Sequence, residues 1–441
     1  MCDENILNAA AKRLTESAPV LPDAELMPYV QSFLNRRELF LSVVREHGSP
    51  LYFIDEPALL HRAEQFVGVF RSELSDFRAY FAVKCNNHPA IAASLARAGL
   101  GLDVSSGLEL ALALEAGAAS IVFTGPAKTD DELRLALQHA DRVSVLMDSF
   151  RELERLETLA ASASRTVRAG IRLTTDEHGL WRKFGIPLYA LNQFFKTAAG
   201  CSHVDLCGLH FHTSWNLDPG AQVAFIECLG DTLKAFDGTV LRRIRFLDIG
   251  GGFWPPRGEW LLETATPAGR LREAAFGPLL PSLTHFRYPA ASIETFAAEI
   301  GRAVRQFIFP VIQPTIFAEP GRWIANEAMH ILLTVVDRKG DDVAITDAGT
   351  NTIGWERFEH DYAPVINLTR PALEEHLTHV LGSLCTPHDV WGTAFFGEDI
   401  QPGDILLIPD QGAYTWSLRQ HFIKPLPRSV VWNGTTHKVY D

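Results

Sequence analysis

The sequence predicts an α/β protein: a (β/α)8 TIM-like barrel joined to a C-terminal antiparallel β domain, a sandwich or a small barrel. Three observations predict this fold. β-like runs alternate with helix-period segments through eight units between residues 77 and 318, the order that closes a parallel sheet inside a ring of helices. After Ala328 the chain changes to short strands broken by turn residues, a texture typical of antiparallel sheets. The length of 441 residues suits one barrel-sized domain and a smaller one.

The barrel strands are expected at apolar runs that end beside turn or helix signals. Helix-period segments between them cover residues 108–116, 131–139 and 150–161, and Thr129 is placed to cap the second. An open doubly wound sheet is the alternative, although eight units would be many for it. The eight expected strands are 80–84, 101–104, 121–124, 143–147, 167–173, 206–212, 244–249 and 315–318.

Both ends of the chain are expected to lie outside the barrel. Residues 1–48 have the pattern of helices of mixed polarity, and the short strand Leu51–Ile54 has no barrel partner. We therefore predict that this strand pairs with the C-terminal sheet, whose strands are expected at 330–336, 342–345, 379–381, 404–408 and 429–432. The expected domains are residues 1–55 (helices plus a strand of the β domain), 56–327 (barrel) and 328–441 (β domain).

Composition restricts the kind of partner. The net charge is -13 and Lys/Arg runs are absent, which argues against nucleic acid and anionic membranes and favours a small molecule. The six cysteines have neither metal-ligand spacing nor disulfide-scaffold density, so we expect no metal and a reducing compartment. The N-terminus lacks a basic start with an apolar core, and no apolar run is long enough to cross a bilayer. A cytoplasmic location is expected.

Residues with reactive side chains stand at the C-terminal ends of the expected barrel strands, where barrel enzymes build their active sites. Lys84 leaves an apolar run; it is either a strand-end charge reaching water or, in a dry pocket, an amine that loses its proton and becomes a nucleophile. Asp103 and Arg172 are expected to form a charge pair that braces the lysine end. The full set is Lys84, Asp103, Arg172, His212, Gly250, Gly251, Gly252 and Glu319.

Three of these features indicate one cofactor. The glycines Gly250–Gly252 expose backbone N–H groups that suit a phosphate, although glycine triplets also serve as ordinary turns. Glu319 would keep a pyridine nitrogen protonated, unless it forms only a surface pair with Arg322. His212 could stack on a flat ring or be structural. A nucleophilic lysine, a phosphate loop and a ring-facing carboxylate together indicate pyridoxal 5'-phosphate (PLP).

These motifs resemble the fold type III PLP-dependent decarboxylases, specifically the ornithine/diaminopimelate decarboxylase family, from about residue 50 to 414. In this resemblance Lys84 of Tyr80–Asn86 is the Schiff-base lysine and Asp103 begins the second-strand motif. The segments Gly125–Lys128 and Lys183–Gly185 are also similar to family segments. The resemblance implies that the cofactor is bound by Lys84, Asp103, Arg172, His212, Ser214, Gly250, Gly251, Gly252, Glu319, Gly321, Arg322 and Tyr414.

The resemblance extends into the β domain and implies a homodimer. Gly382–Asp389 is similar to the family's Gly-x-x-Cys-x-x-x-Asp segment, so Cys385 is expected to enter the partner subunit's site and return a proton to the carbanion. Without the family, Cys385 would be a buried thiol. Gln411–Tyr414 is similar to the segment whose tyrosine contacts the cofactor. The expected catalytic residues are Lys84, Cys385 and His212, and the expected substrate-binding residues are Thr386 and Asp389.

Departures from the family pattern leave the substrate open. The residue after the cysteine is acidic in ornithine- and diaminopimelate-type enzymes but is Thr386 here. The family's His-x-Gly-Ser motif is also altered, to the sequence His-Thr-Ser-Trp-Asn that begins at His212. The segment from Phe253 to Ala291 is longer than usual; it is either a solvated surface loop or a cover over the site that binds an extra carboxylate. Its candidate residues are Trp254, Arg257, Arg270, Arg272 and Arg287.

Decarboxylation of a diamino acid or a modified amino acid is the predicted reaction, and two alternatives remain. Fold type III racemases resemble this barrel but place an arginine against the pyridine nitrogen, so Glu319 favours a full carbanion and loss of carbon dioxide. A non-catalytic PLP carrier or regulator is the second alternative. Small carriers of this type lack the second domain, and regulatory relatives typically lose cofactor residues that are present here.

Overall fold

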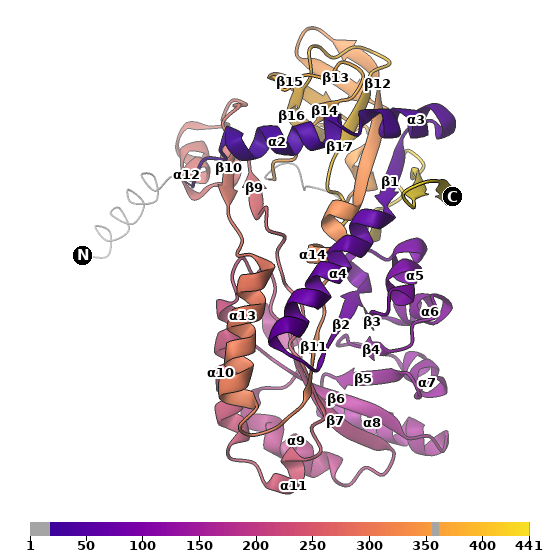
Figure 1. The fold of residues 1–441 in the computed structure, drawn as a ribbon, viewed down its shortest axis with the longest axis vertical. Helices are drawn as coiled ribbons and strands as arrows, with labels where there is room; N and C mark the ends of the chain where they lie inside the picture. The colour runs from indigo at the N-terminus through magenta and orange to yellow at the C-terminus, as the bar shows by residue number, and fades with distance from the viewer. Residues whose placement is uncertain (1–17, 355–360, 441) are drawn as a thin grey trace, which may run out of the picture. The chain divides into compact units, whose positions relative to one another are not determined.

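The computed structural model describes residues 18–354 and 361–440, and Figure 1 labels their helices and strands. The chain divides into two compact units. One comprises residues 58–256 and 291–325, and the other comprises residues 1–57, 257–290 and 326–441. The domain boundaries expected from the sequence lie close to these divisions, but residues 257–290, which those boundaries leave in the barrel, group with the second unit.

The first unit is a closed eight-stranded parallel barrel, as the sequence predicts (Figure 1). β11 closes it by pairing with β2 on one side and β8 on the other. In order around the barrel its strands are β2 (Phe77–Ala82), β3 (Gly101–Val104), β4 (Ile121–Phe123), β5 (Val143–Met147), β6 (Val167–Leu173), β7 (Val204–Phe211), β8 (Phe246–Asp248) and β11 (Thr315–Ala318).

Helices surround this sheet, and their sequences show why they begin where they do. Thr129 makes a complete capping box with Glu132 at the start of α7, so the capping role expected for it is confirmed. The helices of this region are α4 (Glu56–Glu73), α5 (Pro89–Arg97), α6 (Gly107–Glu115), α7 (Asp130–Gln138), α8 (Phe150–Ser162), α9 (Leu191–Ala198), α10 (Gly220–Leu233), α11 (Gly238–Leu241), α13 (Ile293–Ala303) and α14 (Arg322–Ala325).

Apolar side chains fill the barrel interior. Phe246 and Phe317 stack with ring centroids 4.8 Å apart, and Tyr80, Val122, Leu146 and Cys207 complete the same buried cluster. A Cβ on Gly208 would lie 1.9 Å from the Phe246 ring, so only glycine fits beside this aromatic layer. The packed interior leaves the strand ends as the place for polar chemistry.

The second unit is built on a nine-stranded sheet with the order β13-β15-β16-β14-β17-β12-β1-β18-β19. β1 (Leu51–Asp55) pairs with β12 and β18, so the prediction that the early strand joins the C-terminal sheet is confirmed. The sheet is mostly antiparallel, but β1–β18, β13–β15 and β14–β16 are parallel pairs. Its other strands are β12 (Met329–Lys339), β13 (Val343–Thr346), β14 (Ile366–Asn367), β15 (Glu375–Leu381), β16 (Val390–Phe396), β17 (Ile405–Ile408), β18 (Arg428–Trp432) and β19 (His437–Tyr440).

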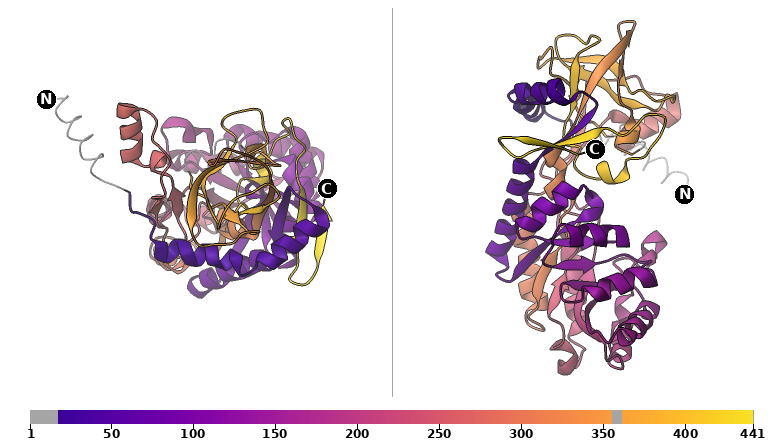
Figure 2. Two further views of the ribbon diagram at one scale, coloured as in Figure 1. Left: turned by 90° about the horizontal axis from the view of Figure 1, so that it is seen from above. Right: turned by 90° about the vertical axis from the view of Figure 1, so that its right-hand side faces the viewer.

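Two N-terminal helices, α2 (Asp23–Leu34) and α3 (Arg37–His47), pack on this sheet through Val30, Phe33 and Phe40. The two views of Figure 2 show α2 and α3 beside the strands of the same unit. Expected helices before residue 18 lie outside the described residues. The sequence missed β14, β16 and β19, since β14 has only two residues and β16 includes Gly392, a weak strand former.

Residues 257–290 form an ordered part of the second unit. β9 (Glu259–Leu261) and β10 (Phe286–Tyr288) pair antiparallel, and α12 (Pro267–Phe276) lies between them in the sequence. His285 Nε2 lies 2.8 Å from Glu375 Oε2 on β15, and the His285 ring stacks on Tyr362. The interpretation of this stretch as a solvated loop is therefore wrong for its two strands.

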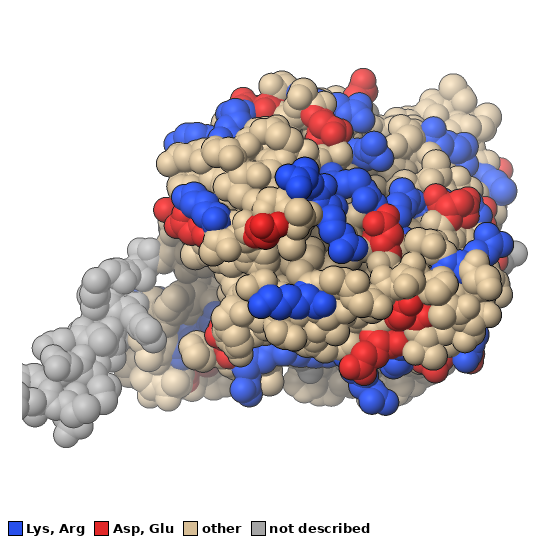
Figure 3. All heavy atoms as spheres, turned by 90° about the horizontal axis from the view of Figure 1, so that it is seen from below, with Lys and Arg blue, Asp and Glu red and all other residues tan. Residues whose placement is uncertain are grey.

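Charges of both signs lie on the surface. On the face shown in Figure 3, several Lys and Arg side chains gather near the centre, with Asp and Glu side chains around them. Among the described residues, no helix is both long enough and apolar enough to cross a membrane.

Candidate active site

Lys84 lies just past the C-terminal end of β2, at the barrel mouth. β2 ends at Ala82, and Lys84 sits in the 3-10 turn Val83–Cys85 rather than in the strand itself. Its Nζ lies 2.6 Å from Asp103 Oδ2, at the end of β3. Burial and the nearby charge of Glu319 raise the pKa of Asp103, while Lys84 and the Thr124 hydroxyl partly offset this shift. The fully buried carboxyl of Asp103 therefore fixes the position of the amine.

Asp103 does not pair with Arg172, so the charge pair expected from the sequence is wrong. The side-chain partners of Asp103 are Lys84 and Thr124. The guanidinium of Arg172 instead lies over the Phe184 ring, 4.6 Å from its centroid. β3 and β6 end at the same mouth of the barrel, but they are three strands apart. The Arg172 side chain instead contacts a nearer partner, the Phe184 ring in the loop that follows β6.

Glu319 follows β11 and is buried between His210 of β7 and His212, which comes just after that strand. Its Oε1 lies 3.3 Å from His210 Nε2, and its Oε2 lies 3.4 Å from His212 Nδ1. Burial alone would raise the pKa of Glu319, but its interactions with His210 and with the charge of Lys84 outweigh burial and hold this pKa well below its usual value. Glu319 is therefore an ionised carboxylate inside the barrel mouth.

His212 is a neutral imidazole at physiological pH. Burial lowers its pKa to about 4. The charges of Lys84 and Arg172 also lower this pKa, and Glu319 raises it by less. Its Nδ1 accepts the Gly251 N–H at 3.1 Å, which assigns the ring proton to Nε2. His210 was not predicted from the sequence. The pattern His210-Phe211-His212 could have indicated it, because residues two apart in an extended chain point to the same side.

The glycine loop after β8 is a close-packed backbone cradle. A Cβ on Gly250, Gly251 or Gly252 would lie within 2.4 Å of the carbonyl oxygen of Phe211, Glu319 or Thr213. The N–H groups of Gly250 and Gly251 donate to Asp248 Oδ1 and His212 Nδ1. Among the described residues, only the Gly252 N–H of this triplet has no acceptor, so it is the loop donor directly available to a phosphate.

Gly321 brings the loop after β11 against the turn that carries Lys84. A Cβ on Gly321 would lie 2.8 Å from Cys85 Cβ, and the Ala82 N–H donates to Pro320 O at 3.2 Å. The next residue, Arg322, places its guanidinium 4.3 Å from the centroid of a Trp254 ring. The Glu-Pro-Gly-Arg sequence thus sets the approach of Glu319 to the turn that carries Lys84.

Lys128 joins the loops that follow β4, β5 and β6. Its buried ammonium donates to the carbonyls of Gly125 and Leu146 at 2.6 and 2.8 Å and pairs with Glu152 Oε1 at 2.8 Å. Asp148 Oδ1 in turn accepts the Gly185 N–H at 2.7 Å. The two family-like segments 125–128 and 183–185 are therefore parts of one buried network that supports the mouth.

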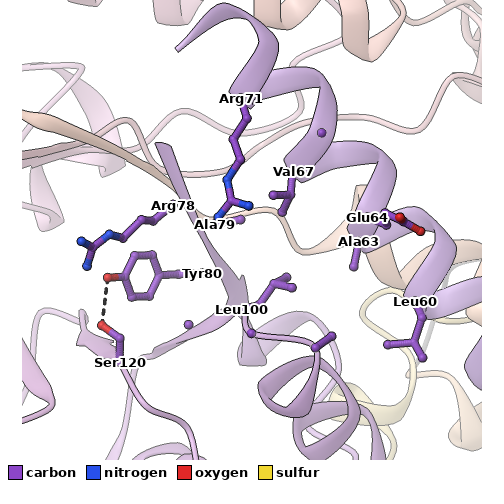
Figure 4. A pocket seen from close by; sticks show the side chains of 14 residues that line it. Leu60, Ala63, Glu64, Val67, Arg71, Arg78, Ala79, Tyr80, Leu100 and Ser120 are labelled. Atoms are coloured by element: carbon purple, nitrogen blue, oxygen red, sulfur yellow. Dashed lines mark hydrogen bonds between the residues drawn. The ribbon is translucent and has the colours of Figure 1, made fainter. Parts of the chain in front are cut away.

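Two cavities differ in their relation to this site. One of about 450 Å³ borders His212 and is lined by Thr175, Trp181, Ser214 and α10 residues. Another of about 710 Å³ lies at the opposite, N-terminal ends of β2 to β4, beside α4. In Figure 4 the side chains of Arg71, Arg78 and Tyr80 border this second cavity. Because barrel chemistry sits at the C-terminal ends of strands, the second cavity is not the candidate site.

The residues at the mouth fit a flat, phosphorylated pyridine aldehyde. They comprise an amine, an ionised carboxylate, a neutral imidazole and a glycine cradle that any side chain would fill. Residues 61–275 match the protein family described as the pyridoxal binding domain of pyridoxal-dependent decarboxylases. The chain is also 28% identical over 402 residues to the diaminopimelate decarboxylase of Methanothermobacter thermautotrophicus, covering 88% of this chain and 87% of that one.

In sequence and in fold, the chain is similar to the fold type III PLP-dependent decarboxylases. It is an amino-acid decarboxylase whose cofactor is PLP. A second relative, 27% identical over 389 residues, is the L-glutamyl-(BtrI acyl-carrier protein) decarboxylase of Niallia circulans, with 82% of this chain and 84% of that one covered. The solved diaminopimelate decarboxylase of Helicobacter pylori complexed with L-lysine aligns with a TM-score of 0.73 over 91% of this chain and 95% of that one. At 22% identity this last likeness shows the fold.

The remaining predicted residues of the decarboxylase lie in the second unit. Cys385 is an exposed free thiol on the turn after β15, so the alternative of a buried thiol is wrong. Asp389 is buried, and its carboxylate accepts the N–H groups of Thr350 and Leu384, both at 2.7 Å. These bonds give Asp389 a role in shaping the turn that carries Cys385 and Thr386, and its contact with a substrate stays a prediction. Tyr414 follows β17 with a φ of 58°.

Proposed function

We propose that the decarboxylase acts on an amino acid of the diamino-acid or modified amino-acid class and that Cys385 returns a proton to the α-carbon across a homodimer interface. The observation that carries this proposal is the ionised state of Glu319, held in place by His210. PLP supplies an electron sink for the pair of electrons left when carbon dioxide departs. A carboxylate at the ring nitrogen keeps that sink protonated.

Glu319 favours decarboxylation over racemisation. A racemase of this fold type is expected to present an arginine to the ring nitrogen, which leaves the nitrogen unprotonated and the carbanion less stable. The buried carboxylate does the reverse, because a proton on the ring nitrogen gains a counter-charge. Loss of carbon dioxide requires a stable carbanion, so it is the reaction this site supports.

The other residues at the mouth have separable roles in the proposal. Lys84 attaches the cofactor, and Asp103 orients the lysine amine through the 2.6 Å contact. The neutral ring of His212 provides a flat face for stacking, without a positive charge that would repel a protonated pyridine. The Gly252 N–H and Arg322 are the phosphate contacts we infer, and Tyr414 is the cofactor contact we infer from the second unit.

Cys385 suits proton return because its thiol is exposed on a fixed turn. Asp389 fixes this turn by accepting the backbone N–H of Leu384 within the turn and that of Thr350 in a separate segment. A positioned thiol can act as a general acid and give its proton to a carbanion. The contribution of a positioned proton donor is on the order of 10²–10⁴-fold in rate.

The substrate side chain is expected to differ from a plain diamino acid. Thr386 replaces the acidic residue that would face a distal ammonium, so this position offers a hydroxyl rather than a counter-charge. The two relatives described above act, by name, on diaminopimelate and on an L-glutamyl group carried by a protein. A modified, larger or D-configured amino acid fits these observations.

A product-detected screen tests the proposal. The PLP-loaded enzyme is incubated with L- and D-lysine, ornithine, meso-diaminopimelate and N-acylated or amide-linked amino acids, and carbon dioxide and the amine product are measured. We expect release of carbon dioxide from one structural class, and none from the Lys84→Ala variant. Exchange of enantiomers without carbon dioxide release, or PLP binding without any turnover across the panel, contradicts the proposal.

A further inference from the structure

The turn that carries Tyr414 has a strained backbone. Asp410 and Tyr414 both have positive φ angles, 54° and 58°, in the left-handed region that favours glycine. Non-glycine residues persist there only when surrounding contacts determine their conformation. The contacts that hold this turn are therefore part of how the Tyr414 side chain is aimed.

Backbone hydrogen bonds fix the turn from the side of β12. The Asp410 N–H donates to His330 Nδ1 at 3.0 Å, and the Gln411 N–H donates to Met329 O at 2.6 Å. The Gly412 N–H donates to Asn326 O at 3.0 Å. Burial, together with the charge of Arg36, lowers the pKa of His330 to about 3, so its ring is neutral and its Nδ1 can accept this bond.

Side chains from two distant segments fix the same turn through the Asp410 carboxylate. Oδ2 of Asp410 accepts hydrogen bonds from the hydroxyl of Tyr29 at 2.8 Å and from Nη1 of Arg257 at 3.1 Å. Arg257 Nη1 also donates to the Tyr29 hydroxyl oxygen at 2.6 Å. Three polar groups therefore form a closed triangle, in which Tyr29 comes from α2 and Arg257 precedes β9.

Within the triangle, the Asp410 carboxylate is paired with a cation and shielded from water. Asp410 is 4% exposed, and its negative charge is matched by the guanidinium of Arg257. That guanidinium lies 5.1 Å from the ring centroid of Tyr29 and 4.8 Å from that of Trp260. Burial, with Asp410 acting the same way, raises the pKa of Tyr29 well above its usual value, so its hydroxyl keeps the proton that it donates.

We propose that Arg257 and Tyr29 are positioning residues that hold the Asp410–Tyr414 turn in the conformation that presents Tyr414 to the cofactor. The proposal rests on the proposed function, in which Tyr414 contacts PLP. Arg257 lies in the long segment from Phe253 to Ala291, and the proposal gives that segment a role: it sets the geometry of a cofactor contact. Arg257 was a candidate for binding a substrate carboxylate, but in the structure its guanidinium pairs with the carboxylate of Asp410.

Binding of PLP to the apoenzyme tests this inference, with the dissociation constant measured by titration of the cofactor's visible absorbance. We expect Arg257→Met and the milder Tyr29→Phe each to weaken PLP binding by about tenfold, since each removes a bond to a buried carboxylate. Arg272→Met is the matched control. Arg272 lies in the same segment but forms an exposed pair with Glu263, so its replacement should leave the dissociation constant unchanged.

A double-mutant cycle separates positioning from general stability. If the triangle acts through Tyr414, Arg257→Met combined with Tyr414→Phe will bind PLP no more weakly than Tyr414→Phe alone. Full additivity overturns the proposal, as does a lower urea midpoint in Arg257→Met and Tyr29→Phe with an unchanged dissociation constant. If Tyr414→Phe itself binds PLP normally, the cofactor contact fails and the inference fails with it. Weaker PLP binding in Tyr414→Phe, with unchanged dissociation constants in Arg257→Met and Tyr29→Phe, overturns only the positioning role.

Discussion

Two buried carboxyl groups flank the glycine loop, and their pKa values are shifted in opposite directions. Glu319 has its pKa held well below the usual value, while burial and the charge of Glu319 raise the pKa of Asp248 well above its usual value. Asp248 Oδ1 accepts the Gly250 N–H at 2.9 Å. Paired titratable groups whose pKa values are pushed apart are typical of sites where one group has a catalytic charge.

Replacing each carboxyl by its amide tests this division. Glu319→Gln removes the counter-charge for the ring proton and should lower kcat on the order of 10²-fold. Asp248→Asn keeps a neutral acceptor for the Gly250 N–H, so its loss should be at least tenfold smaller. Steady-state kinetics with saturating PLP measure both. Equal losses in the two variants would show that the charge of Glu319 has no special role.

At the scale of elements, the barrel mouth depends on connections between successive loops. Lys128, just before α7, bonds to the loop after β4, to Leu146 of β5 and to Glu152 of α8. The side chains of Lys128 and Glu152 are 1% and 5% exposed, so water cannot replace either partner. The network joins loops separated in the sequence and so supports the mouth without touching the substrate.

Lys128→Met should destabilise the chain by about 3–5 kcal/mol, because it leaves buried Glu152 and Asp148 without their counter-charge. Urea denaturation measures the change in the free energy of unfolding. Adding Glu152→Gln to Lys128→Met should recover part of the loss. Arg134→Met, which breaks only the exposed pair with Asp131, should cost less than about 1 kcal/mol. A Lys128→Met loss as small as that of Arg134→Met contradicts the network.

At the scale of the whole molecule, the proposed site needs residues from both units. Lys84, Asp103 and Glu319 belong to the barrel unit, and Cys385 and Tyr414 belong to the unit with the β domain. In the proposed homodimer, the Cys385 turn of one subunit serves the barrel of the other. Symmetric dimers that exchange residues in this way have two equivalent composite sites.

Subunit mixing tests the shared site. Lys84→Ala and Cys385→Ala homodimers should each be nearly inactive, but mixed dimers contain one site with both residues intact. Random assortment then gives about a quarter of the wild-type activity. Denaturing and refolding the two variants together, followed by a decarboxylation assay, measures this recovery. Cys201→Ser, which alters another thiol of the chain, is the control and should retain activity. No recovery on mixing would place both residues in the same subunit's site.

Much of the barrel could be predicted from the sequence, because the signals that define it are local. Apolar runs such as Val143–Met147 and Val167–Leu173 read as buried strands, and helix periods separate them. Strand counting then placed Lys84, Glu319 and the glycine loop at one end of the sheet. The β domain was predicted less completely, since β14 has only two residues and pairs with the more distant β16 and β17, and β16 contains Gly392.

The sequence by itself determined the kind of chemistry, because the reactive residue types stand at strand ends that a barrel must bring together. Only the tertiary structure decided which side chains meet. It placed His210 beside Glu319, paired Asp103 with Lys84 instead of Arg172, and joined Arg257 to Asp410. Such contacts depend on barrel closure, loop conformation and burial, which act between residues far apart in the chain and leave no periodic signal in it.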